Sequence, residues 1–324
     1  MRGIVVTALV TVIIPCRNAA SWLAQAVESS LDQSWPAVEI IIVDNGSTDG
    51  SLAVARSYEG ARLSVLECQR PGASAARNDG LAHANGDFIQ FLDADDVLDR
   101  NKVALQMGRL ATVPAGSIAS GGWARFHGDL AEARFTPEPV WSDLAAEDFL
   151  ISSWLGGGMM PDFAWLTPRA VIEAAGPWDE SLSVGDDGEY FCRVALAASG
   201  ILFCGEARGY YRSGAPDTLS RRRDRKALES AYRAIELSCE HLLARNHSSP
   251  ARTACAALHQ RFIYDVFPEV PDLVAQAEAR VETLGGSDLQ IEGGRGFQTI
   301  KRCLGWKAAR RAQLQWHNLI ARAS

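Results

Sequence analysis

The stretch DFIQFLDADD, Asp87–Asp96, joins an apolar run to three aspartates within four positions. The apolar residues are typical of a buried strand, so like charges crowd together where a core element ends. Carboxylates this close raise one another's pKa values and cost stability. A divalent cation removes that cost, and Mg²⁺ and Mn²⁺ prefer the oxygens of carboxylates and phosphates. We therefore predict that Asp93 and Asp95 form a metal site, with a plain turn as the alternative. Asp96 and Asp99 are predicted to cap the next helix.

Strand-like and helix-like patterns alternate along the first hundred residues. We predict strands at 10–15, 38–44, 61–67 and 87–93, and helices at 19–34, 47–60 and 72–86. Strands that are apolar on both faces and separated by helices predict an α/β fold with a parallel sheet covered on both sides. In such sheets ligands bind beyond the carboxyl ends of the strands. Polar residues follow three of these strands, at 16–18, 44–47 and 93–96, so we expect them to meet at one edge.

The chain beyond residue 115 is less regular. We predict a strand within 116–128, a strand and a helix ending at Gly176 within 161–182, and a helix at 185–200. Two short strands are predicted at 201–213. From about residue 221 the sequence is rich in Ala, Arg, Leu and Glu and is predicted to be mostly helical. We therefore expect an α/β domain at 1–220, with halves at about 10–115 and 116–220, and a helical region at 221–324.

Composition excludes several classes of protein. The net charge of −7 gives no global basic field, so we expect no nucleic-acid partner. The seven cysteines include no CxxC pair and are odd in number, which argues against a zinc site or a disulfide framework and favours a reducing cytoplasm. The apolar N-terminus is shorter than the roughly 20 residues of a membrane span. We expect a cytoplasmic protein, at most peripheral at the inner face of a membrane.

Several polar residues of the sheet edge have two interpretations each. Asp44 is suited to accept a hydrogen bond from a nucleobase N–H, or to form an Asx-turn before the next helix. Asn18 and Ser47 allow similar capping roles. Arg77, on the helix before the metal strand, is suited to pair with a phosphate, but the residues alone favour an ordinary surface arginine.

Three acids compete for the role of a general base. Asp186, Asp187 and Glu189 lie at the start of the helix predicted at 185–200. Acids at a helix N-terminus are favoured by the helix dipole, so a purely structural role is the alternative. A carboxylate within hydrogen-bond reach of a hydroxyl can take its proton. Spacing alone does not choose among the three.

Three segments together resemble the family 2 glycosyltransferases of the GT-A fold. They are VTVIIPCRNAASWLAQAVESSLDQSWPAVEIIIVDNGSTDGS, RPGASAARNDGLAHANGDFIQFLDADD and GDDGEYFCRVALAASG. The resemblance covers roughly residues 10–215 and implies an inverting transferase that uses a nucleotide-diphosphate sugar, with UDP as the usual nucleotide, and Mn²⁺ or Mg²⁺. It implies that Asp187 is the base and that 10–115 is the nucleotide-sugar half and 116–220 the acceptor half. The donor-binding residues that it implies are Pro15, Arg17, Asn18, Asp44, Ser47, Arg77, Asp93 and Asp95, with Asp93 and Asp95 also at the metal.

The sequence departs from the family pattern at one position and leaves a later segment open. Asn45 stands where a second aspartate is commoner, which weakens a donor-binding role for this position. The segment YYRSGAPDTLSRRR resembles a family loop that closes over the donor. By that likeness Arg212 and Ser220 contact phosphate, although a surface loop can be basic for other reasons.

The acceptor is expected to be a glycan, a lipid-linked saccharide or a small molecule. Trp154 and Trp165 are suited to stack on a sugar ring, or they belong to the core; Asp186 is a further candidate near the acceptor. Residues 301–324 carry six basic residues and no acidic one. This segment is suited to an anionic membrane surface, to a second subunit, or to packing on the catalytic domain, which we favour.

Two rival functions stay open at this point. A GT-A-like protein that binds nucleotide or glycan without turnover is the first. A nucleotidyltransferase is the second, but that class needs a glycine-rich phosphate loop after the first strand, and residues 15–22 contain no glycine.

Overall fold

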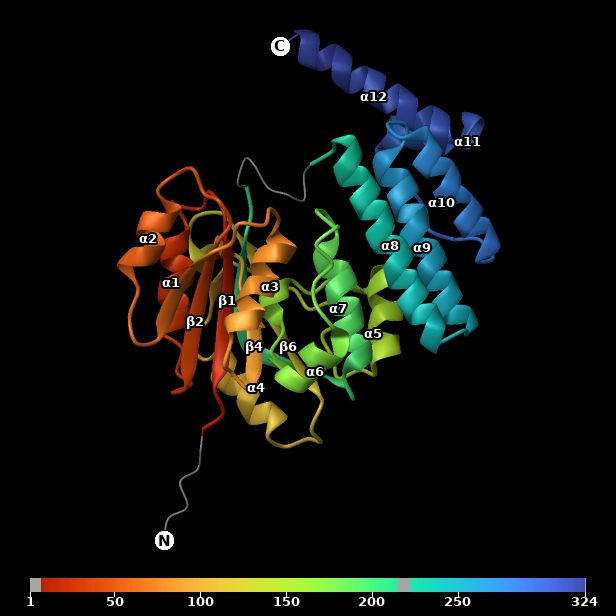
Figure 1. Ribbon diagram of the computed structural model, residues 1–324. Coiled ribbons are helices and arrows are strands. Elements are labelled where there is room, and N and C mark those ends of the chain that lie inside the picture. The colour runs from red at the N-terminus through yellow and green to blue at the C-terminus, as the bar shows by residue number, and fades with distance from the viewer. Residues whose placement is uncertain (1–6, 215–221, 324) are drawn as a thin grey trace.

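The computed structural model describes residues 7–214 and 222–323, with side chains up to residue 316. Its main sheet has five strands in the order β3-β2-β1-β4-β7. Their bounds are β1 Val10–Cys16, β2 Val38–Asp44, β3 Leu63–Glu67, β4 Phe88–Phe91 and β7 Thr167–Pro168. The first four are parallel and β7 is antiparallel to β4. The predicted α/β fold with a mostly parallel sheet is therefore confirmed (Figure 1).

Helices cover both faces of this sheet, which explains the continuous apolar strands. Helices α1 (Leu23–Leu31) and α2 (Ser51–Ser57) pack on the face that carries Ile40 and Ile42. Helix α3 (Ala73–His83) packs on the opposite face, against Ile41 and Val43. The small residues of α3 are needed for this contact, because a Cβ at Gly80 would lie 2.5 Å from the Cγ2 atom of Ile13.

A second sheet of three strands lies beside the first, in the order β5-β8-β6. It comprises β5 (Val97–Leu98), β6 (Ile118–Phe126) and β8 (Ile201–Arg212), with β6 and β8 parallel. The prediction of two short strands at 201–213 is wrong, since β8 is a single strand of 12 residues. An irregularity in its register explains the broken pattern: Gly121 pairs with Cys204, but Trp123 pairs with Gly209.

Further helices complete the packing around both sheets. Helices α6 (Arg169–Ala175) and α7 (Asp186–Ala197) lie within the segments predicted to contain helices, 161–182 and 185–200. The core beneath them is rich in aromatic residues, including Trp165, Trp178, Tyr190 and Phe191. The bounds are α4 Lys102–Leu110, η1 Leu130–Glu132, α5 Ala146–Ser152, η2 Ser153–Gly157, η3 Asp162–Ala164, α6 Arg169–Ala175 and α7 Asp186–Ala197.

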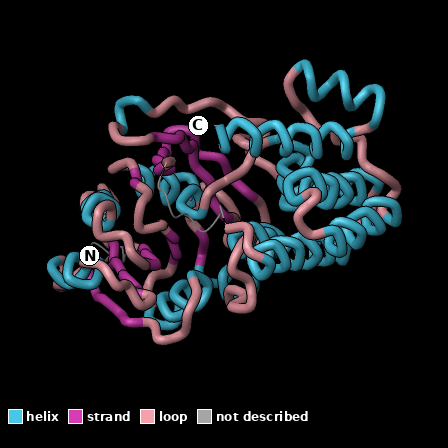
Figure 2. The backbone as a smooth tube through the Cα atoms, turned by 90° about the horizontal axis from the view of Figure 1, so that it is seen from above, coloured by secondary structure: helices cyan, strands magenta, loops and turns pink. Residues whose placement is uncertain are grey.

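The C-terminal part of the chain is helical, as predicted. Its helices are α8 Arg225–Arg245, α9 Ser249–Val266, α10 Pro271–Thr283, α11 Arg295–Leu304 and α12 Trp306–Ala323. They gather on one side of the strands (Figure 2). Helix α8 packs on α7, and Phe262, Leu273 and their neighbours form a separate apolar cluster. The expected boundary near 220 falls between the two described ranges.

The start of α12 packs on the helices before it. The Trp306 ring lies 5.1 Å from that of Phe267 and 4.9 Å from that of Tyr264, and Lys307 pairs with Glu278 at 2.6 Å. Leu304 and Trp316 are exposed. In residues 7–214 and 222–323 no helix is long and apolar enough to cross a bilayer.

Candidate active site

The polar ends of β1, β2 and β4 meet at one edge of the main sheet. Cys16 and Asp44 are register partners, and the Asn45 N–H donates to the Cys16 carbonyl at 2.8 Å. The Leu92 N–H, just before Asp93, donates to the Ile13 carbonyl at 3.0 Å. The convergence expected from the strand pattern is therefore present in the structure.

The turns after β1 and β2 lock each other in place. Asn18, with a φ of 51°, donates its backbone N–H to Ser47 Oγ and accepts from the Thr48 N–H at 2.8 Å. The Ser47 N–H donates to Asp44 Oδ2 at 3.1 Å, so Asp44 forms the Asx-turn that was one of its two interpretations. Its other oxygen, Oδ1, is buried without a hydrogen-bond partner among the described residues. That oxygen needs a donor, as the nucleobase interpretation requires.

The remaining predicted residues of this edge differ in exposure. Pro15 lies within β1 and is half-buried, whereas Arg17 is exposed. Asn45 has a structural role, because its Oδ1 accepts from the Gly72 N–H at 2.8 Å and its Nδ2 donates to the Arg70 carbonyl at 2.6 Å. The residue that departs from the family pattern thus fixes the loop that leads into α3.

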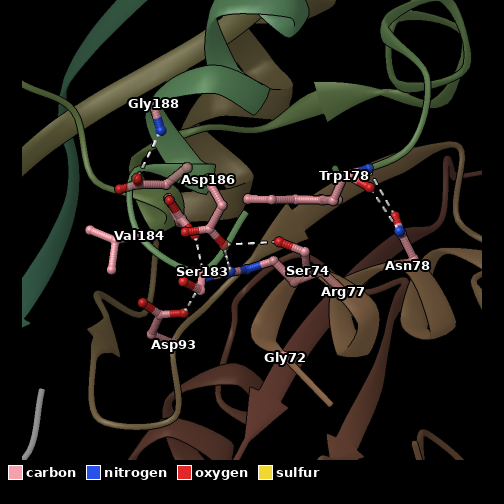
Figure 3. A network of polar contacts seen from close by, with 12 residues as sticks. Gly72, Ser74, Arg77, Asn78, Asp93, Trp178, Ser183, Val184, Asp186 and Gly188 are labelled. Atoms are coloured by element: carbon pink, nitrogen blue, oxygen red, sulfur yellow. Dashed lines mark hydrogen bonds and ion pairs between the residues drawn. The ribbon is translucent and has the colours of Figure 1, made fainter. Parts of the chain in front are cut away.

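Arg77 is the centre of the site, and the expectation of a surface arginine is wrong. Its side chain is buried, and its Nη2 lies 2.8 Å from both Asp93 Oδ1 and Asp162 Oδ2. Its Nη1 lies 3.2 Å from Asp186 Oδ2. Figure 3 shows the Arg77 guanidinium between Asp93, which follows β4, and Asp186 of α7. Burial alone would lower the pKa of Arg77, but Asp162, Asp93 and Asp186 together raise it, so the guanidinium stays charged.

Aromatic packing fixes this arginine from one side. The Arg77 Cζ atom lies 4.4 Å from the centroid of the Trp178 ring, a cation–π contact. Trp178 stacks on Tyr190 at 3.9 Å, and the Asn78 side chain exchanges two hydrogen bonds with the Trp178 backbone (Figure 3). Asp162, Asn78 and Trp178 were missed by the sequence analysis. Only Asp162 carried a signal, as an acid between apolar residues.

Asp93 and Asp95 form an incompletely neutralised pair. The Asp93 side chain is 42% exposed and pairs with Arg77. Burial, and then the charge of Asp93, raise the pKa of Asp95 to about 6. No group of three or more His, Cys, Asp or Glu in the described ranges is arranged to hold a metal. Two carboxylates still fit Mg²⁺ or Mn²⁺, which complete their shells with water and substrate phosphate.

The three acids at the start of α7 differ in their contacts, and this difference distinguishes their roles. Glu189 is buried and paired with Arg193 at 2.6 Å and with His241, which removes it as a base. Asp186 is bound by Arg77 and by Ser74 Oγ. Within the part of the chain that the structure describes, Asp187 accepts only the neighbouring Gly188 N–H, at 2.8 Å, and it is open to solvent on one side. Protein atoms crowd its other sides, and this desolvation, followed by the charge of Asp186, raises the pKa of Asp187.

Comparison with known proteins agrees with this geometry. The model of Glycosyl transferase family 2 matches residues 11–170. The succinoglycan biosynthesis protein ExoU of Rhizobium meliloti (strain 1021) is 31% identical over 278 residues, which are 79% of this chain and 75% of that protein. The chain is a family 2 glycosyltransferase.

Other relatives match a shorter part of this glycosyltransferase. The teichuronic acid biosynthesis glycosyltransferase TuaG of Bacillus subtilis (strain 168), named as putative, is 41% identical over 102 residues, 31% of this chain and 40% of that protein. Among solved structures, S. aureus TarS 1–349 in complex with UDP-GlcNAc superposes with a TM-score of 0.71 at 17% identity, covering 95% of this chain and 92% of that one. This likeness shows the shared GT-A fold.

Asp96 has a different role in the glycosyltransferase from the predicted helix cap. It is buried, and its Oδ1 accepts the backbone N–H of Arg212 at 2.7 Å. Helix α4 instead begins after Asn101, whose N–H is bound by Asp99 Oδ1 at 3.0 Å. The Arg212 side chain donates to the Asp95 carbonyl at 2.8 Å and to Gln25. Arg212 thus fixes the loop of Asp95 and Asp96, while Ser220 lies outside the described residues.

Trp154 and Trp165 lie in the core of the glycosyltransferase, the second of their two interpretations. They are 9% and 2% exposed. The Trp165 ring packs at 5.6 Å on Phe191 and at 5.2 Å on Phe149. Neither indole is available for stacking on an acceptor sugar, so the expectation of that role is wrong.

Proposed function

We propose that this enzyme transfers a sugar from a nucleotide-diphosphate sugar, with UDP as the nucleotide, to an acceptor hydroxyl with inversion. The observation that carries the proposal is the placement of Arg77. One guanidinium holds Asp93, beside Asp95, and Asp186, beside Asp187, so the acids that suit a metal and the acid that suits a base border the same space.

The donor is held at the carboxyl edge of the main sheet. The unpartnered Oδ1 of Asp44 accepts the nucleobase N–H, and the turn of Asn18 and Ser47 borders the nucleoside. Asp93 and Asp95 would hold Mn²⁺ or Mg²⁺, which would neutralise the charge of the leaving diphosphate as a Lewis acid. TarS in complex with UDP-GlcNAc and PcManGT of Pyrobaculum calidifontis in complex with GDP-Man and Mn²⁺ share the fold, the latter with a TM-score of 0.54, which supports this class of donor.

Asp187 removes the proton of the attacking hydroxyl. Its exposed carboxylate is free of ion pairs in the described residues, and its raised pKa makes it a stronger base than an ordinary aspartate. The hydroxyl attacks the anomeric carbon from the face opposite the diphosphate, so a single displacement inverts that centre. Asp186 and Arg77 keep the base in position.

The acceptor is a saccharide, and the enzyme works in the cytoplasm. The names of ExoU and TuaG, which refer to succinoglycan and teichuronic acid biosynthesis, support a role in making a polysaccharide or glycoconjugate. The basic C-terminal helices bring the enzyme to the inner face of the membrane or to a second subunit.

A panel of donors with and without metal tests the proposal. Thermal unfolding is measured with UDP-glucose, UDP-galactose, UDP-GlcNAc and GDP-mannose, each with and without Mn²⁺, together with release of the free sugar. We expect one donor to raise the Tm only with Mn²⁺ and to be hydrolysed slowly, and Asp95→Asn to lose both effects. Equal shifts for every nucleotide, with or without metal, would contradict the proposal. A specific shift without any hydrolysis or transfer would favour the inactive binding protein.

A further inference from the structure

The end of the chain has a charge opposite to that of the rest. Residues 293–324 contain no Asp or Glu and seven basic residues, namely Arg295, Lys301, Arg302, Lys307, Arg310, Arg311 and Arg322. Because the whole chain has a net charge of −7, setting these seven positive charges apart leaves −14 on residues 1–292. Most of the basic segment forms α11 and α12, and basic amphipathic helices are typical of proteins that bind an anionic surface.

The apolar faces of α11 and α12 continue beyond the part that is packed. Phe297, Ile300 and Leu304 recur every three or four residues, so they share one face of α11. Phe297 is buried, but Leu304 is 73% exposed. Ala309 and Trp316 lie on one face of α12, two turns apart, and their exposed fractions are 1% and 64%. Each helix therefore carries a large apolar side chain into solvent on the same face that packs on the protein. In Figure 1, α12 lies beyond the ends of α8 and α9, and its C-terminal half extends clear of them.

Exposed basic side chains accompany these apolar groups. Arg302 and Arg311 are exposed, and neither forms an ion pair within the described residues. The Arg311 Cζ atom instead lies 5.1 Å from the centroid of the Phe267 ring. Among the basic residues of α11 and α12 whose side chains the structure describes, only Lys307 forms an ion pair, with Glu278. Most of the positive charge of these helices is therefore left for a partner outside the chain.

We propose that α11 and α12 bind the enzyme to a bilayer with anionic headgroups, an inference that rests on the proposed function only for the purpose of the binding. Arg302 and Arg311 contact the lipid phosphates. Leu304 and Trp316 lie at the level of the headgroups, where tryptophan is enriched in membrane proteins. These exposed apolar side chains favour lipid over other polyanions, since only a bilayer offers an apolar layer beneath its charges.

The charges favour the bilayer over a second subunit, the other partner that the proposed function allows. In a symmetric dimer the same surface meets itself, so contact through α11 and α12 would place seven positive charges against seven. An anionic bilayer attracts these charges and repels the −14 of residues 1–292. The same asymmetry therefore orients the enzyme, with its C-terminal helices toward the lipid.

Co-sedimentation of the full-length protein with vesicles tests this surface. The vesicles contain phosphatidylcholine alone or a mixture of phosphatidylcholine and phosphatidylglycerol, at low and at high salt. We expect binding to the mixed vesicles only, and its loss at high salt, because salt screens charges at an exposed surface. The double variant Arg302→Ala, Arg311→Ala should bind about 30-fold more weakly, roughly fivefold for each basic residue. Leu304→Gln and Trp316→Ser should each weaken binding about tenfold, through the apolar contact that is lost.

An exposed arginine and an exposed leucine outside these helices provide matched controls. Arg100 is exposed just before α4, and Leu105 of α4 is 41% exposed. Arg100→Ala and Leu105→Gln should both bind the mixed vesicles as well as the wild type does.

Three results would overturn the proposal. The first is equal binding to both kinds of vesicle, or binding to neither. The second is binding to the mixed vesicles that Leu304→Gln and Trp316→Ser leave unchanged, because this would indicate a site for any polyanion. The third is a dimer in solution that the double arginine variant converts to a monomer, which would assign the surface to a second copy of the chain.

The Mn²⁺-dependent rise in Tm with a donor, measured on the same proteins, separates this surface from the proposed function. Every variant should keep the rise, because none of the replaced residues lies at the donor edge. If the rise is present but the mixed vesicles are not bound, only the membrane surface is overturned. Vesicle binding without the rise would contradict the proposed function and support the membrane surface.

Discussion

Two buried basic side chains, Arg77 and Lys102, have different surroundings. Arg77, near the end of β4, is surrounded by the carboxylates of Asp93, Asp162 and Asp186. Lys102 is fully buried, and its Nζ donates to Gln90 Oε1 at 2.6 Å and to Gln106 Oε1 at 2.7 Å. In the described ranges Lys102 has no carboxylate partner.

Lys102, Gln90 and Gln106 form an amide network, whose hydrogen bonds hold the neighbouring backbone in place. The Nε2 groups of Gln90 and Gln106 donate to the carbonyls of Phe163 and Ala164, at 2.9 Å and 2.8 Å. These carbonyls belong to the short helix η3, which begins with Asp162, the partner of Arg77. One segment therefore joins the amide network on its interior side to the carboxylates at the strand ends. Burial lowers the pKa of Lys102 to about 7, so this lysine titrates near neutral pH.

Asp93, Asp162 and Asp186 form an acidic cluster around Arg77. This cluster has more carboxylates than basic groups, whereas the amide network contains no carboxylate. Three carboxylates around a single guanidinium leave room for a further cation, and Asp95 beside them has a pKa raised to about 6. Surplus charge near a core costs stability unless a ligand neutralises it. The comparison teaches that this protein surrounds one buried basic side chain with neutral amides and the other with carboxylates, and only the second arrangement attracts a further cation.

Loss of the base should have the largest effect in the acidic cluster. We expect Asp187→Asn to lower kcat about 10³-fold, since general base catalysis contributes roughly 10²–10⁴. In the wild type, kcat/KM should fall tenfold for each pH unit below the raised pKa of Asp187. This fall at low pH should be absent from Asp187→Asn. Asp186→Asn, which alters contacts of Arg77 and Ser74 but keeps the Asp187 carboxylate, is the comparison and should keep the dependence on the Asp187 pKa. Equal losses in both variants would show that the two acids act together.

Replacing Arg77 or Lys102 by methionine should lower the free energy of unfolding by different amounts. Arg77→Met leaves three acids without their partner, and we expect it to cost about 3–5 kcal/mol, as for a broken buried ion pair. Lys102→Met leaves two amide oxygens without a donor and should cost about 1–3 kcal/mol. Urea unfolding at pH 7 measures both values. Similar costs would mean that carboxylates and amides contribute equally to the core.

Asp95→Asn should stabilise the metal-free protein while removing metal binding. The carboxyl pKa is raised to about 6 in the fold, so the charged form is disfavoured there and its contribution to stability falls as pH rises from about 4 to 6. At pH 7 the variant should gain up to about 3 kcal/mol. Thermal unfolding with and without Mn²⁺ tests this. A lower Tm without metal would show that the Asp95 charge is already compensated by the protein.

The titration of Lys102 should give the smallest effect. The folded state releases this proton near pH 7 and the unfolded state near 10.5, so between these values the unfolded state binds more protons. Stability should therefore rise with pH, by about 2 kcal/mol from pH 7 to 9 relative to Lys102→Met. Urea unfolding of both proteins across this range measures the difference. A constant difference would mean that the lysine keeps its charge in the core.

The sequence predicted the sheet edge well, because parallel strands that end in polar residues must bring those residues together. It predicted the wrong environment for Arg77, since the three acids that bury it come from 16, 85 and 109 residues along the chain. No local pattern contains that information. The role of Asp96 was also hidden, because its partner is a backbone N–H on β8, which side-chain patterns do not reveal.

Aromatic residues were the hardest to assign from the sequence. Trp154 and Trp165 pack in the core beneath α7, whereas Trp123, as buried as Trp154, lies in the second sheet beneath Arg125. A tryptophan has the same local pattern in both settings. Its place depends on strand register, and the irregular pairing of β6 with β8 decides that register.

The bond from Asp96 to the Arg212 backbone has a consequence for how such enzymes diversify. Because the carboxylate binds a main-chain N–H, every amino acid except proline can occupy position 212 and keep the link. The second sheet can therefore exchange its side chains during evolution while its attachment to the aspartate loop persists. Side chains of the second sheet can then change, and specificity with them, while the hydrogen bond between the aspartate loop and β8 is kept.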